Sequence, residues 1–203
     1  MTEHPRNYSG LTRIVHWLNA FAILGLISSG WAIFNAAPFY PLQFPSWLAL
    51  GGGLTGALRW HFALMWIFAA CTGLLLTARV IAQAGGPALR PASLRQITRE
   101  LKQIIRLNLA HDHGRYLHIQ RFIYLGVIVL FIAAILSGLA LWKPVQLQFL
   151  ADGMGGYELA RRIHFWAMAG IAAFILVHLV MVMLVPASLL RMWLGARVVE
   201  AGR

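Results

Sequence analysis

Four long apolar stretches constrain the fold of this 203-residue chain more than any other feature. They lie near residues 11–34, 57–81, 118–141 and 161–185, and each holds the roughly 20 apolar residues that an α-helix needs to cross a bilayer. A chain that is 60% hydrophobic and 11% charged is also too apolar for an ordinary soluble domain. We therefore expect an all-α, integral membrane four-helix bundle, formed as a single domain over residues 1–203 without an internal repeat.

The distribution of charge predicts how the helices are oriented. The net charge is +11, and most of the 17 Lys and Arg residues fall on the cytoplasmic side if the N-terminus is cytoplasmic. This positive-inside bias predicts that both termini are cytoplasmic. Because the basic residues follow the topology of the chain, we do not expect binding of nucleic acid. The few basic residues that would face outward are Arg59, Lys143, Arg161 and Arg162.

The connection between the second and third spans predicts a further helix. Residues 94–106 place apolar side chains at helical spacing, with Arg and Lys between them. Such a pattern is typical of a basic amphipathic helix that lies on the cytoplasmic leaflet of the bilayer. Packing of this helix on a partner protein is the alternative. The tail after Pro186 is expected to be short and basic.

Four histidines lie within the apolar stretches. His164 and His178 are fourteen residues apart, which is nearly four helical turns, so they share a helix face about 21 Å apart. In the predicted topology His16 and His178 lie near the inner surface, and His61 and His164 lie near the outer surface. Imidazoles are costly in a membrane, and bundles hold cofactors between facing helices. The pattern predicts two haems, ligated by His16 with His178 and by His61 with His164. Interhelical hydrogen bonding by these histidines is the alternative.

Two glycines and a glutamine are placed to serve such sites. Gly30 follows His16 by fourteen residues, so it shares the face of His16 and would leave room for a macrocycle. Gln120 and Gly138 are eighteen residues apart, about five turns, and we expect their shared face to turn toward the haems. His118 is a rival for the inner ligand. The single cysteine, Cys71, excludes covalent attachment of haem through a C-x-x-C-H motif.

Three arginines lie within a helical turn of a predicted ligand. Haem propionates are anionic and would accept charge-assisted hydrogen bonds from them. Anchoring of the helix ends at the membrane surface explains the same positions equally well. These residues are Arg13, Arg161 and Arg162.

Several motifs resemble the bacterial cytochrome b561 family, which includes cytochrome b subunits of hydrogenases, formate dehydrogenases and thiosulfate reductases. Residues 13–17, followed by Ser29-Gly30-Trp31, are similar to the first helix of that family. Gln120-Arg121 and residues 137–142 are similar to its third helix. Residues 160–166 and the spacing of His164 and His178 resemble its last helix, in the thiosulfate-reductase-like branch. The chain departs from its relatives at Tyr116-Leu117-His118, where they often carry Tyr-Asn-Pro.

The resemblance implies two b-type haems with these four histidines as ligands, and exchange of electrons with the quinone pool. It places a quinone site near the inner haem, among polar residues before the third span, although a solvated loop is the alternative. These residues are Asn108, His111, Asp112, His113, His118 and Gln120.

We therefore expect a multi-pass protein of the bacterial inner membrane, part of a respiratory chain, that links quinone to a redox partner on the periplasmic side. A molybdenum enzyme or a c-type cytochrome would suit as the partner. The alternative function is that of a self-sufficient superoxide:quinone oxidoreductase. No residue is assigned a catalytic role, and the oligomeric state, a homodimer included, is left open.

Overall fold

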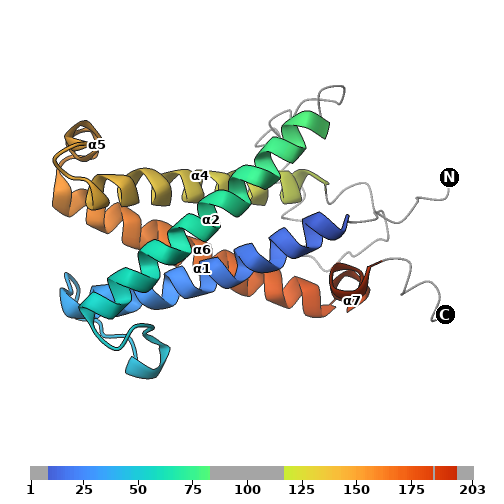
Figure 1. The fold of residues 1–203 in the computed structure, drawn as a ribbon, viewed down its shortest axis with the longest axis horizontal. Coiled ribbons are helices and arrows are strands. Elements are labelled where there is room, and N and C mark those ends of the chain that lie inside the picture. Colours follow the sequence, from blue (N-terminus) through green and yellow to red (C-terminus); the bar gives the residue numbers. More distant parts are fainter. Residues whose placement is uncertain (1–8, 83–116, 185, 196–203) are drawn as a thin grey trace, which may run out of the picture. The chain divides into compact units, whose positions relative to one another are not determined.

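The computed structural model describes residues 9–82, 117–184 and 186–195, and its regular structure within these ranges is helical throughout. The long helices are α1 (Gly10–Ala36), α2 (Leu54–Ala82), α4 (Leu117–Trp142) and α6 (Tyr157–Leu184) (Figure 1). Each contains a segment long and apolar enough to cross a membrane. This confirms the predicted all-α class and the four spans, whose ends differ from the predicted ones by a few residues. The predicted amphipathic helix at 94–106 lies outside the described residues.

Helices α1 and α2 run antiparallel and lie side by side (Figure 1). Ser9 begins α1 as its N-cap, accepting a hydrogen bond from the Thr12 backbone N–H at 3.1 Å. Gly25 of α1 packs tightly against α2, because a Cβ built there would lie 2.5 Å from Cδ1 of Leu64. Leu64 is only 1% exposed, so its side chain fills the space that the glycine leaves. Small residues that admit a neighbouring side chain are the usual basis of packing between membrane helices.

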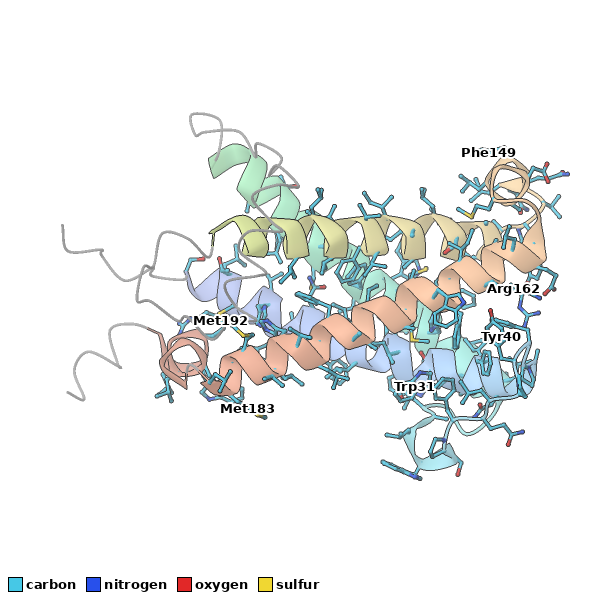
Figure 2. All side chains as sticks on the ribbon, turned by 180° about the vertical axis from the view of Figure 1, so that it is seen from behind. Trp31, Tyr40, Phe149, Arg162, Met183 and Met192 are labelled. Carbon is cyan, nitrogen blue, oxygen red and sulfur yellow. The ribbon has the colours of Figure 1, made fainter. Side chains whose placement is uncertain are left out.

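The loop that joins α1 to α2 is folded back against the end of α1. The Asn35 side chain holds Phe44 at both backbone groups: Asn35 Nδ2 donates to Phe44 O at 2.8 Å, and Phe44 N donates to Asn35 Oδ1 at 2.9 Å. The rings of Trp31 and Phe44 stack with centroids 4.9 Å apart. Figure 2 shows Trp31 and Tyr40 at this end of α1. The backbone of the loop at Phe44 is thus bonded to the end of α1.

A short 3₁₀ helix, η1 (Ser46–Leu48), follows in the same loop. The Ser28 hydroxyl donates to Leu48 O, and Leu50 N donates to Ser28 Oγ at 3.1 Å. The loop therefore returns along α1 to the level of Ser28. Trp47 lies in this 3₁₀ helix and is 81% exposed.

The segment after Pro186 forms a helix, α7 (Pro186–Leu194), where the sequence predicted only a short tail. Proline is favoured in the first turn of a helix, and Gly195 ends this one with a φ of +88°. Arg13 of α1 contacts the end of α7: its Nη1 donates to Trp193 O at 3.4 Å. Trp17 and Trp193 meet edge to face, with centroids 5.0 Å apart. A cation at the carbonyl end of a helix is favourable, so Arg13 stabilises α7 against α1.

Helices α4, α5 (Gln148–Gly153) and α6 form a second group. Its core is a cluster of alanines, Ala140, Ala151 and Ala160, each at most 5% exposed. Their small side chains let the end of α4 approach the start of α6. Further along these helices, a Cβ on Gly170 of α6 would lie 2.9 Å from Cδ1 of Leu130 of α4.

Candidate haem-ligand sites

His61 of α2 is held by the neighbouring helix α1. The hydroxyl of Ser29 lies 3.0 Å from His61 Nδ1, and Ser29 is fully buried. The next residue, Gly30, faces the adjacent edge of the same ring: a Cβ built on it would lie 3.7 Å from His61 Cε1. A Ser-Gly pair on α1 therefore orients the imidazole by its Nδ1 edge, so ligation of a metal by this ring would use Nε2.

His164 of α6 is held by α4 in the same way. Ser137 Oγ lies 3.1 Å from His164 Nδ1, and Ser137 is also fully buried. The carbonyl oxygen of Ala134 lies 2.9 Å from the same nitrogen. The next residue, Gly138, faces the ring edge, since a Cβ there would lie 3.0 Å from His164 Cε1.

These two arrangements come from a short sequence pattern that occurs twice. Ser, Gly and Ala occupy the first, second and fourth places of both 29–32 and 137–140. Ala, Arg, His, Phe and Met occupy the first, third, fifth, sixth and ninth places of both 57–65 and 160–168. The predictions from the sequence did not include this recurrence. The serines were also missed as functional residues, and this recurrence is the signal that identifies them.

The other two predicted ligands lie elsewhere on the same helices. His16 is on α1, where its ring meets that of Trp17 with centroids 5.6 Å apart. His178 is on α6 and stacks on Phe174, with centroids 5.9 Å apart and an angle of 22° between the planes. Asn19, one turn after His16, donates from Nδ2 to Thr72 Oγ1 of α2 at 3.3 Å. The chain from His164 to His178 is helical throughout, which keeps the predicted separation of about 21 Å.

The three predicted propionate arginines differ in their surroundings. Arg13 Nε is buried and has no hydrogen-bond partner among the described residues. Arg161 Nη1 donates to both carboxylate oxygens of Glu158 at 3.3 Å. Arg162 is exposed near the start of α6 (Figure 2). Gln120 lies in the first turn of α4, and its side chain is outside the described set, as are residues 108–113.

Four apolar helices, with two half-buried histidines that are each oriented at Nδ1 by a buried serine, define a membrane protein that can hold a cofactor by imidazole. A family model described as prokaryotic cytochrome b561 matches residues 7–195. The chain belongs to the prokaryotic cytochrome b561 family. It is accordingly a multi-pass membrane protein that binds haem b and transfers electrons to a redox partner.

A curated relative is similar over almost the whole length of both proteins. It is the putative protein-methionine-sulfoxide reductase subunit YedZ1 of Azospira oryzae, 42% identical over 184 residues, which are 90% of this chain and 93% of the relative. Its name places it outside the hydrogenase, formate dehydrogenase and thiosulfate reductase subunits that the sequence motifs suggested.

The described residues fit haem. Imidazole nitrogen is a usual axial ligand of haem iron, and the hydrogen bond at Nδ1 supplies the outer contact that orients such a ligand. Around the Cβ position of Gly30, the ring of His61 is the one neighbour within 4 Å among the described residues, so the glycine leaves space beside that imidazole. The orphaned N–H of Arg13 Nε is a donor suited to an anionic carboxylate.

Proposed function

We propose that this chain carries two haems and conducts electrons across the bacterial inner membrane, from quinol to a reductase on the periplasmic side. His16 with His178 would ligate the inner haem, and His61 with His164 the outer one. The observation that carries the proposal is the repeated anchoring of His61 and His164 by a buried serine at Nδ1. If these histidines only joined helices, the same hydrogen bond between Nδ1 and a buried serine would not be expected in both helix pairs.

The ligand set favours electron transfer over catalysis at iron. Bound haem b supplies a one-electron carrier. With two histidines holding each iron, substrate would have no access to the metal, and the group would serve to carry electrons. The residues of this chain would then bind and orient the carriers, and the apolar helices would keep water away from them.

The inner end would exchange electrons with quinone. Both termini are proposed to be cytoplasmic, on the strength of the distribution of Lys and Arg. The polar residues at 108–113, with His118 and Gln120, would supply the hydrogen-bonding groups that a quinone site requires. Arg13 would pair with a propionate through Nε while its Nη1 holds α7.

The partner at the outer end would be a reductase of oxidised methionine in proteins. The name of the relative supports this class of partner, because the similarity covers 93% of that protein. The same name supports the direction of electron flow, since a reductase consumes electrons. This replaces the broader expectation of any molybdenum enzyme or c-type cytochrome.

The experiment is a reconstitution. The purified protein in liposomes is reduced with a quinol analogue, and its haem absorbance is followed after a periplasmic methionine-sulfoxide reductase and an oxidised peptide are added. We expect two haems per chain, stable reduction by quinol, and reoxidation only when reductase and peptide are both present. His61→Ala serves as the matched control, since it would keep the inner haem reducible and abolish reoxidation.

Two outcomes would count against the proposal. One haem per chain would remove the second carrier. Rapid haem reduction by superoxide in the isolated protein, with no response to the reductase, would instead favour the superoxide:quinone oxidoreductase.

A further inference from the structure

We propose that Ser29 and Ser137 are positioning residues of the outer haem, each fixing the Nδ1–H tautomer and the ring plane of one ligand histidine. This inference rests on the proposed function, in which His61 and His164 ligate the same iron. It goes beyond that function because it gives a role in orienting the ligands to two serines that are not ligands themselves.

The direction of each hydrogen bond follows from counting protons. A serine hydroxyl has one proton to donate. Ser29 Oγ lies 2.7 Å from the carbonyl oxygen of Gly25 and 3.2 Å from that of Leu26, neither of which can donate. Its proton is therefore committed to the helix backbone. The Ser29 oxygen must accept from His61, so the proton of that imidazole is on Nδ1 and the lone pair is on Nε2.

The same count holds in the second helix pair. The Ser137 hydroxyl donates to the backbone of its own helix, at the carbonyls of Ala133 and Ala134. His164 Nδ1 also lies 2.9 Å from Ala134 O, an atom that only accepts. Two independent acceptors thus require a proton on Nδ1 of His164. In both rings the lone pair that a ligand of iron needs is therefore on Nε2.

Burial makes the serines hard to replace by solvent. Both are fully buried in an apolar helix interface, where water is scarce and an unpaired N–H is costly. The donating hydroxyl is also polarised by the carbonyl that it bonds, which strengthens it as an acceptor. A neutral acceptor of this kind orients the imidazole without drawing off its proton, whereas a carboxylate would push the ligand toward imidazolate.

The test is Ser29→Ala and Ser137→Ala, made singly and together in the full-length protein. We expect each variant to keep two haems. The low-spin ferric electron paramagnetic resonance signal of the outer haem should shift in the double variant, because the ring planes lose an anchor. The midpoint potential of that haem should rise, because His61 loses its acceptor at Nδ1 and His164 keeps only Ala134 O, so the two ligands donate less charge to iron. Ser29→Thr and Ser137→Thr keep the hydroxyl and should restore both values.

Ser28→Ala is the matched control. Ser28 is the neighbouring serine of the same helix, but its hydroxyl bonds Leu48 of the loop instead of a histidine. The outer signal is identified as the one that His61→Ala removes. Unchanged outer signal and potential in the double variant, or an equal change in Ser28→Ala, would overturn the inference. A wild-type protein without two haems would overturn the proposed function instead, so the two failures are distinguishable.

Discussion

Gly138 lies so close to His164 that a side chain at position 138 would require the imidazole to shift by a few tenths of an ångström. A Cβ built on Gly138 would lie 3.0 Å from His164 Cε1 and 3.4 Å from its Nδ1. The same nitrogen bonds Ser137 Oγ and Ala134 O, so the ring cannot retreat without giving up those bonds. The size of the residue at position 138 therefore determines how closely the imidazole of His164 approaches α4.

Gly138→Ala should displace this ring and weaken the outer haem. The added methyl would push the Cε1 edge away by a few tenths of an ångström and lengthen the bonds at Nδ1. We expect a lower haem content or a broadened outer signal, measured by absorbance per chain and by electron paramagnetic resonance. Gly126→Ala on the same helix is the control, because nothing lies within 4 Å of its Cβ position. Equal haem content in both variants would contradict the prediction.

The pairing of ligands is tested by single substitutions. His61→Ala and His164→Ala should each remove the same haem and leave the other with its spectrum and potential unchanged. His16→Ala and His178→Ala should each remove the remaining one. Absorbance, potentiometric titration and haem counts distinguish the two sets. Loss of different haems from the His61 and His164 variants would refute the pairing.

Gly25 and Leu64 should be energetically coupled. Leu64→Ala should lower stability by about 2–5 kcal/mol, as removal of a buried leucine usually does. Gly25→Ala should also be destabilising, because its methyl would overlap Leu64 Cδ1. In the double variant the methyl would partly fill the space left by the leucine, so the two losses should not add. Thermal denaturation of the four proteins gives the coupling, expected at about 0.5–3 kcal/mol; additive losses would show that the two residues are independent.

Arg13 should stabilise the last turn of α7. Arg13→Met removes the hydrogen bond to Trp193 O and the charge at the helix end, an effect of about 0.3–1 kcal/mol. Hydrogen exchange in the last turn of α7 should therefore quicken about two- to fivefold. Arg13→Lys keeps the charge and should show a smaller change. Exchange as slow as in the wild type would mean that Trp17 and other contacts hold α7 without the arginine.

The sequence was sufficient to predict the long helices because their signal is strong and repeated. Each is an uninterrupted apolar run of the length that a bilayer demands, and this is why their ends were found to within a few residues. The four histidines were identified because they are exceptions within these runs: a polar imidazole in an apolar membrane helix is costly and requires an explanation.

The serines escaped notice because serine is common in membrane helices and bonds its own backbone. Only the structure places the hydroxyl of Ser29 against His61, a residue of a different helix. The helix at Pro186–Leu194 was missed because nine residues give too short a pattern to stand out from a basic tail. The fold of the loop depends on Asn35 reaching Phe44 nine residues away, a contact that no local pattern announces.

The proton held on Nδ1 of His61 and His164 affects how charge would move across the membrane. A histidine relays protons by accepting on one ring nitrogen and releasing from the other. His61 and His164 would have one nitrogen tied to serine and the other tied to iron, so neither could pass a proton along the helix. Electrons would then cross this part of the membrane without a compensating positive charge. Each turnover would be electrogenic, and a membrane potential that is negative inside would assist this outward transfer of electrons to the repair of oxidised protein outside the cell.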